Sequence, residues 1–178
     1  LPHWGLSGDL RVFSERIDNG IGANWVTPIE YANGDRYEIS GAEYQVSWTP
    51  SRQTRIFFNQ SWTDIRIDGA AHPDDHFISA IGHAAPRYAA SLTAMHTLAN
   101  GLALTFTHQR AEDFAMASDN WLLHSMMRTD VRAAKPFRVG KSQAELAVTV
   151  QNVGVPYADG NRNFYFDRRT LVSLRVSY

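Results

Sequence analysis

Apolar and polar residues alternate along much of the chain, and the alternation is clearest at the C-terminus. There the apolar positions are every second residue, namely Val172, Leu174, Val176 and Tyr178. A period of two places successive side chains on opposite faces of a β-strand. The pattern therefore predicts a final strand over residues 170–178, with one apolar and one polar face.

The same alternation recurs upstream, in segments separated by residues typical of turns. With the final strand, the predicted strands are residues 6–16, 43–48, 55–63, 87–94, 102–109, 121–134, 143–151 and 170–178. No segment shows the 3.6-residue period of an amphipathic helix. The sequence thus predicts an all-β protein of about eight strands.

The predicted connections alternate strictly between short and long. Residues 49–53, 98–101 and 136–142 are short and rich in Pro, Gly, Asn and Ser, whereas 17–35, 65–86, 111–120 and 153–167 are longer and polar. Outer-membrane barrels have short periplasmic turns and long external loops. We therefore predict an antiparallel, up-and-down transmembrane β-barrel segment with both termini on the periplasmic side.

Composition excludes several other classes. The hydrophobic fraction is 44%, but the apolar runs are much shorter than the roughly 20 residues that a membrane-spanning helix needs. Cysteine is absent, which excludes disulfides and thiolate metal sites. The 17 basic and 18 acidic residues give no electrostatic argument for nucleic acid as a partner.

Several segments, taken in their order and spacing, resemble one family of large outer-membrane barrels. They are SGAEY at 40–44 with VSWTP at 46–50, APRYAASL at 85–92, VRAAKPFRVG at 131–140, VQNV at 150–153 and FDRR at 166–169 before the final strand. In this arrangement the chain is similar to the C-terminal part of a TonB-dependent receptor, a barrel that imports siderophores, vitamins and other scarce nutrients.

The resemblance implies that residues 1–178 are the last third or so of a 22-stranded barrel. The plug domain and the TonB box that precede this barrel in the family are not visible. The chain also begins at Leu1 without a signal segment, so we expect a removed leader or, better supported, a piece of a longer polypeptide. The implied location is the bacterial outer membrane. The implied partners are outer-membrane lipid, the barrel-assembly machinery and, through the missing N-terminal part, a TonB-type energy-coupling protein.

The last strand resembles a signal that the barrel-assembly machinery reads, an aromatic terminus with apolar residues at alternating positions before it. The residues concerned are Val172, Leu174, Val176 and Tyr178. Tyr178 would also anchor the strand at the membrane interface. Trp48 at the turn ends, and Tyr88 and Trp121 near the loop ends, are expected to extend the two interfacial rings of aromatic residues.

One predicted external loop contains a group of possible ligands for a metal ion or an iron-bearing molecule. It consists of His72, Asp74, Asp75 and His76, with His83 downstream. Imidazole and carboxylate groups bind transition metals. The spacing matches no standard metal site, however, and a solvated loop commonly contains such residues. We therefore predict no resident metal or cofactor and keep the group as a candidate ligand contact.

Six charged residues fall on the polar face of the last three predicted strands. They are Arg128, Asp130, Arg132, Glu145, Arg169 and Arg175. A charge facing lipid near the middle of the bilayer costs about 2–4 kcal/mol, so this face is predicted to line the lumen. There the six residues would contact a plug or form an ion-pair network that fills the lumen.

No motif predicts an enzyme. A G-x-S-x-G elbow, an H-E-x-x-H helix and a Gly-rich phosphate loop are all absent. Ser125 follows His124, but adjacent strand residues point to opposite faces and cannot act together as nucleophile and base.

Two alternatives remain open. A complete eight-stranded barrel with a structural or adhesive role would close by pairing residues 6–16 with 170–178. A soluble lipocalin-like binder would instead place the apolar faces of its strands inside.

Overall fold

The computed structural model describes residues 4–24, 29–71, 81–116, 121–159 and 163–178, with the backbone alone for 24, 116 and 121–123. No helix in these ranges is both long enough and apolar enough to cross a membrane.

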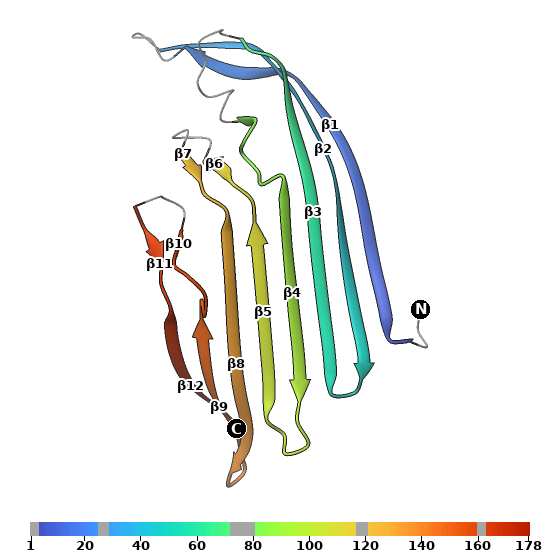
Figure 1. The fold of residues 1–178 in the computed structure, drawn as a ribbon, viewed down its shortest axis with the longest axis vertical. Coiled ribbons are helices and arrows are strands. Elements are labelled where there is room, and N and C mark those ends of the chain that lie inside the picture. The colour runs from blue at the N-terminus through green and yellow to red at the C-terminus, as the bar shows by residue number, and fades with distance from the viewer. Residues whose placement is uncertain (1–3, 25–28, 72–80, 117–120, 160–162) are drawn as a thin grey trace.

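Eight strands form one antiparallel sheet in the order β1-β2-β3-β4-β5-β8-β9-β12 (Figure 1). Their bounds are β1 Leu6–Asn24, β2 Glu30–Ser51, β3 Thr54–Gly69, β4 Tyr88–Thr97, β5 Ala103–Ala111, β8 Met126–Val139, β9 Ser142–Gln151 and β12 Arg169–Ser177. Two short hairpins pair β6 (Phe114–Met116) with β7 (Trp121–Leu123) and β10 (Tyr157–Ala158) with β11 (Tyr165–Phe166).

The strands of the large sheet follow one another in the same order as in the chain, and each pairs with its neighbours in that order. The connections between β2 and β3, β4 and β5, and β8 and β9 lie at one end of the sheet, here called the turn end (Figure 1). The opposite end is called the loop end. The predicted all-β, up-and-down architecture is confirmed. β1 and β12 are the two edges, and the described residues show no pairing between them, so these strands do not close a small barrel.

The strands near the N-terminus are longer than predicted. β1 and β2 continue through most of the predicted loop 17–35, with register shifts at Gly20 and a positive φ of 60° at Asn19. This extension is hydrogen-bonded as sheet but has no continuous apolar face. Hydrophobic periodicity therefore could not reveal it.

Two predicted boundaries near the C-terminus are wrong. The predicted strand 121–134 is divided, because β7 pairs with β6 in its own hairpin and β8 begins at Met126. The predicted turn 136–142 is shorter, because β8 continues to Val139. Pro136 is tolerated within β8 because β5 pairs only as far as Ala134, which leaves Pro136 with a neighbouring strand on one side.

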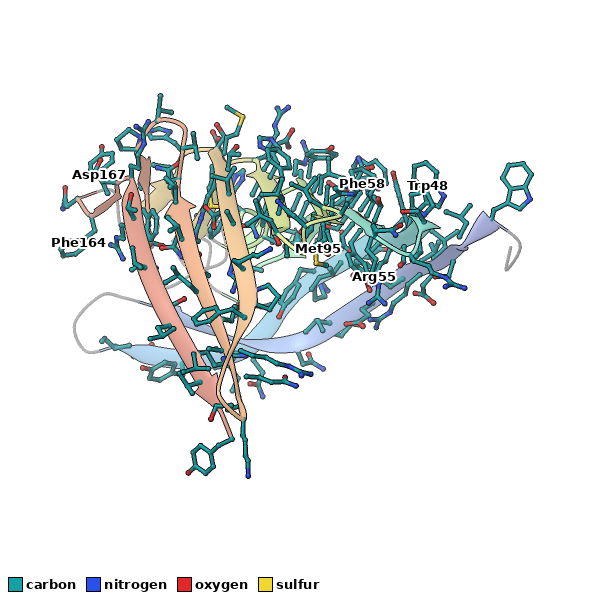
Figure 2. The ribbon with its side chains drawn as sticks, turned by 90° about the horizontal axis from the view of Figure 1, so that it is seen from below. Trp48, Arg55, Phe58, Met95, Phe164 and Asp167 are labelled. Atoms are coloured by element: carbon teal, nitrogen blue, oxygen red, sulfur yellow. The ribbon has the colours of Figure 1, made fainter. Side chains whose placement is uncertain are left out.

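The register separates the sheet into two chemically different faces. Ile56, Ala94, Phe106, Val131 and Val150 form one continuous apolar row across five strands. Figure 2 shows Trp48 and Phe58, which share the parity of this row, on the convex side of the sheet, and Arg55 and Met95 on the concave side. The apolar face is therefore convex.

The convex face is open rather than packed against another layer. Val172 is 70% exposed and Leu146 is 47% exposed, while the buried apolar residues of the described chain are alanines apart from Phe166. A lipocalin-like protein would pack its apolar faces inside, so that alternative is wrong. The sheet has the arrangement of a wall with one apolar and one polar surface.

Candidate functional site

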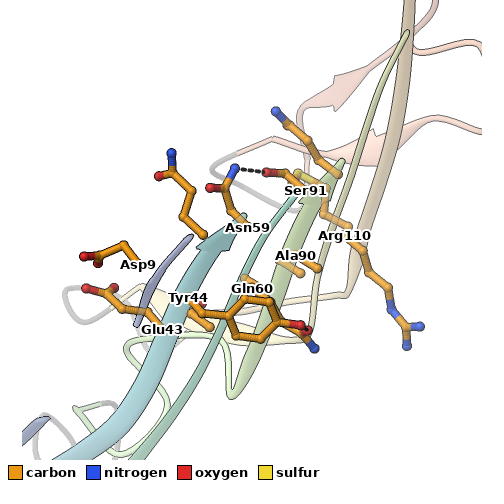
Figure 3. Close-up of a pocket in the computed structure, with 14 residues that line it drawn as sticks. Asp9, Glu43, Tyr44, Asn59, Gln60, Ala90, Ser91 and Arg110 are labelled. Carbon is orange, nitrogen blue, oxygen red and sulfur yellow. Dashed lines mark hydrogen bonds between the residues drawn. The ribbon is translucent and has the colours of Figure 1, made fainter. Parts of the chain in front are cut away.

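The concave face contains a polar hollow of about 500 Å³ that crosses β1 to β5 and is here called the central hollow. It is lined by Asp9, Glu43, Tyr44, Gln45, Asn59, Gln60, Ser61, Ala89, Ala90, Ser91, Gln109, Arg110, Ala111 and Met126. Figure 3 shows Asp9, Glu43, Asn59 and Ser91 on one side of the strands, whereas Tyr44 points to the other side.

Uncharged hydrogen-bonding groups form the middle of the central hollow. Register pairing joins Gln45, Asn59, Ser91 and Gln109 in one row across four strands. Within it, the Asn59 Nδ2 donates to Ser91 Oγ at 3.1 Å (Figure 3). Amides and hydroxyls both donate and accept, so this row can bind a polar surface without requiring an opposite charge.

Carboxylates lie at one rim of the central hollow. Glu43 pairs with Arg11 at 3.2 Å, and the two side chains are 47% and 67% exposed. An ion pair this exposed contributes little to stability. Asp9 lies beside Glu43 (Figure 3), so this rim is acidic and remains accessible to solvent.

The six charged residues predicted on the lumen side share the concave face of β8, β9 and β12. Register pairing across the sheet places them on the same face as the side chains in the middle of the central hollow. That this face lines a lumen stays a prediction. Arg128 makes a two-point contact with Asp130, at 2.7 and 2.8 Å. Arg132 pairs with Glu145 at 2.7 Å. Most of the charge in this region is therefore already paired within the sheet.

The other two residues of this set have different surroundings. Arg175 lies opposite Glu145 in the register, and both line a second hollow of about 420 Å³ near the turn end. The Arg169 guanidinium lies 4.2 Å from the centre of the Phe166 ring, a cation–π geometry.

Asn152 joins the sheet to the segment that follows β9, and sequence reasoning assigned it no role. It is completely buried, with a left-handed φ of 51° that asparagine tolerates better than most residues. Its backbone N–H donates to Asp130 Oδ1 at 2.9 Å, and its Nδ2 donates to the carbonyls of Val155 and Phe166, each at 3.0 Å. Asn152 thus fixes the path of the chain at both ends of residues 153–168.

Phe166 completes this connection. The four residues Arg128, Asn152, Tyr157 and Phe166 are here called the loop root. The Phe166 ring stacks on Tyr157 at 5.6 Å, with an angle of 21° between the rings. The Arg128 guanidinium lies 4.5 Å from the same ring, so one arginine contacts Asp130, Tyr157 and Phe166. The loop root attaches the β10–β11 hairpin to the concave face.

Four residues of the predicted ligand group, His72, Asp74, Asp75 and His76, lie outside the described residues. His83 is exposed, and its backbone carbonyl accepts the Ala115 N–H at 2.7 Å. Within the described ranges, no group of three or more His, Asp or Glu side chains is placed to hold a metal ion. The role of this loop stays a prediction.

The residues of the predicted assembly signal lie along the outer edge of the sheet. Val172, Leu174 and Val176 are 70%, 64% and 53% exposed on the convex face, and Tyr178 follows the end of β12. Their accessibility suits recognition by another protein, which stays a prediction.

Aromatic residues form a band on the convex face towards the loop end. Neighbouring ring centres lie 5.7 Å apart for Tyr44 and Phe58, 5.8 Å for Tyr44 and Trp62, and 6.0 Å for Trp62 and Tyr88. The Tyr44 hydroxyl donates to Gln60 Oε1 at 2.5 Å, which pairs these two polar groups within the band. The predicted position of Tyr88 agrees with this band, which suits a membrane interface.

Asp64 lies on the loop side of Trp62 and accepts hydrogen bonds from two arginines. Arg87 and Arg66 each donate to it at 2.8 Å. The hydrogen bond from Arg87, followed by that from Arg66, holds the pKa of the Asp64 carboxyl below its usual value. Charge therefore begins directly beyond the aromatic band.

Three solved outer-membrane receptors are similar to the chain over nearly its whole length. The ferric-catecholate import receptor Fiu from Escherichia coli K12 covers 95% of this chain, with 13% identity and a TM-score of 0.67. The FpvAI receptor in its complex with pyocin S2 covers 96%, with 17% identity and a TM-score of 0.67. The ferric preacinetobactin receptor BauA from Acinetobacter baumannii covers 97%, with 14% identity and a TM-score of 0.69.

The match extends over only 25%, 25% and 27% of these three receptors. No protein-family model matches the sequence, and no curated protein matches it significantly. The resemblance predicted from the sequence is confirmed in the fold: the chain folds like one part of the β-barrel of TonB-dependent outer-membrane receptors, over a length equal to about a quarter of theirs.

Proposed function

We propose that the chain forms eight strands of an outer-membrane receptor barrel that imports a scarce nutrient. The observation that carries the proposal is the two-faced, open sheet. Its apolar convex face suits lipid, and its polar concave face suits a water-filled or plugged lumen. The similarity to three receptor barrels over at least 95% of the chain supports the same assignment.

Further strands would pair with β1 and β12 in the complete barrel. Both edges expose backbone groups that lipid cannot satisfy. A membrane-spanning sheet must therefore close on itself. On this proposal residues 1–178 are the C-terminal part of the barrel. A plug domain and a TonB-coupling segment would then lie elsewhere in the full-length polypeptide. The barrel-assembly machinery would recognise Val172, Leu174, Val176 and Tyr178.

The proposed ligand class is a ferric siderophore-like molecule. Two of the similar receptors are described as importing or binding ferric compounds. External loops, including His72, Asp74, Asp75, His76 and His83, would make the first contacts, since loops commonly carry the specificity of a scaffold. The central hollow would then provide hydrogen-bonding groups along the lumen, towards an inward step energised by a TonB-type partner.

Iron uptake in the native bacterium tests this proposal. The gene for the full-length polypeptide is deleted, and uptake of radioactive iron is measured with a panel of ferric siderophores. We expect loss of uptake for one class of siderophore, restoration by the intact gene, and an equal loss in a strain that lacks TonB. Unchanged uptake across the panel, or uptake independent of TonB, would overturn the proposal.

A matched pair of variants tests the loop contribution. Changing His72 and His76 together to Ala should weaken uptake of the responding siderophore. The control, Lys141→Ala, lies at the turn end between β8 and β9 and should have no effect on uptake. Equal effects of the two changes would argue against ligand capture by this loop.

A further inference from the structure

The convex face contains an apolar groove of about 530 Å³ that neither ligand capture nor the proposed lumen uses. It crosses β4, β5, β8 and β9, and its apolar lining includes Ala94, Leu104, Phe106, Val131, Ala133 and Val148. Since these residues lie on the face opposite the central hollow, the groove is separate from the proposed lumen.

Small side chains explain why the face is hollowed here. Ala94 lies opposite Phe106 in the register, and Ala133 lies opposite Leu104 in the next row of the same face. A methyl group beside a large side chain leaves a depression along the strands. Phe106 and Leu104 lie on β5, between the strands that carry these alanines, and are 39% and 40% exposed.

The turn end of the groove carries polar groups that can bind an anion. His96 lines the groove, and its Nδ1 lies 2.9 Å from Thr54 Oγ1, which leaves Nε2 for another partner. Lys135 lies on the same face two residues beyond Ala133. Its Nζ donates to the carbonyl of Asn100 in the β4–β5 turn, so its ammonium is held beside the turn end of the groove.

We propose that the groove binds one acyl chain of an anionic phospholipid of the periplasmic leaflet, with the headgroup phosphate at Lys135 and His96. The inference rests on the proposed membrane location. The apolar lining suits a hydrocarbon tail, and the ammonium with its two remaining donors suits a phosphate. An acyl chain beside a charged headgroup matches the polarity of the groove from one end to the other.

Native mass spectrometry of the purified full-length protein tests this proposal directly. The protein is titrated with phosphatidylglycerol and, separately, with phosphatidylcholine of the same chain length. We expect one tightly retained phosphatidylglycerol and weaker binding of phosphatidylcholine. Lys135→Gln should weaken phosphatidylglycerol binding about fivefold, from the loss of one cation near an anionic lipid headgroup.

Two further variants separate the groove from the cation. Ala133→Phe fills the groove and should abolish retention, while Ala42→Phe places the same bulk on the convex face of β2, outside the groove, and should have no effect. Lys141→Gln removes a cation from the neighbouring turn and should also leave binding unchanged. If Ala133→Phe fails to assemble, Lys135→Gln still decides the outcome.

Equal retention of both lipids, or unchanged binding by Lys135→Gln and Ala133→Phe, would overturn the proposal. Membrane fractionation and heat-modifiable mobility of each preparation keep this failure distinct from failure of the receptor assignment. A protein found outside the outer membrane overturns both proposals. A barrel in the outer membrane without lipid preference overturns only this one.

Discussion

The two halves of the concave face use polar residues in different ways. Across β1 to β5, amides and hydroxyls form the central hollow, and the Arg11–Glu43 pair at its rim is exposed. Across β8, β9 and β12, arginines are paired with carboxylates, and the loop root covers part of the face. The first half therefore offers hydrogen-bonding groups to a bound molecule, whereas the second half uses its polar groups to hold the sheet and its loop together.

Exposure decides how much each ion pair contributes. The side chains of Arg128 and Asp130 are 21% and 23% exposed, compared with 67% and 47% for Arg11 and Glu43. Water screens the second pair strongly and the first pair much less. Two arginine–carboxylate pairs on the same face of the sheet are thus expected to differ in energy.

The largest expected effect comes from the loop root. Asn152→Ala removes both Nδ2 hydrogen bonds and places alanine at a positive φ, so it should lower the free energy of unfolding by about 2–4 kcal/mol. The measurement is urea unfolding of the full-length protein in lipid vesicles. Asn33→Ala, at an exposed position of β2, is the control. Equal effects at the two sites would contradict the anchoring role of Asn152.

A double-mutant cycle at Arg128 and Asp130 should give the next largest effect. Replacing each by Ala, singly and together, should reveal a coupling of about 1–2 kcal/mol, because the contact is two-pointed and partly shielded. The same vesicle unfolding assay measures it. A coupling near zero would mean that the loop root does not depend on this pair.

The matching cycle at Arg11 and Glu43 sharpens the comparison. Both side chains face solvent, so the coupling should stay below about 0.5 kcal/mol. A coupling as large as that of Arg128 and Asp130 would show that the rim of the central hollow is as rigid as the loop root. The two halves of the concave face would then not differ as described.

The smallest expected effect concerns acid pH at Asp64. Because its folded-state pKa is depressed, its contribution to stability is present above the unfolded-state pKa, near 4, and is lost as the pH falls through the lower folded-state value. Hydrogen exchange at the loop end of β3 should therefore accelerate in acid relative to Asp64→Asn. The same acid response in both proteins would exclude Asp64 as its cause.

Much of the fold could be predicted because the two faces of the sheet differ in polarity, so apolar and polar residues alternate along each strand. Val172, Leu174 and Val176 are more than half exposed, yet their spacing alone identified the final strand. The extension of β1 beyond Arg16 was missed because Asp18, Asn19, Gly20 and Gly22 interrupt the apolar alternation there. The β6–β7 hairpin was missed because its strands are too short to show a pattern of alternating apolar and polar residues.

The loop root could not be predicted from local sequence. Asn152 bonds to Asp130 and Phe166, which are 22 and 14 residues away, so its importance arises only when β8 and β11 are placed beside it. The pairing of Arg132 with Glu145 likewise depends on the register of β8 and β9. Sequence placed these residues on a polar face but could not separate paired charges from available ones.

We expect the sheet to be a wall with lipid on one face and an aqueous lumen on the other, and a cysteine scan of β9 distinguishes the two faces. Residues 1–178 contain no cysteine, and any cysteine elsewhere in the full-length polypeptide is changed to serine, so each introduced residue is the only thiol. Residues 143–150 are replaced one at a time, and an attached fluorophore is exposed to a lipid-soluble or a water-soluble quencher in outer membranes. We predict lipid quenching at Leu146 and Val148 and aqueous quenching at Glu145 and Thr149, which lie on the concave face. The reverse pattern, or no alternation, would contradict the account.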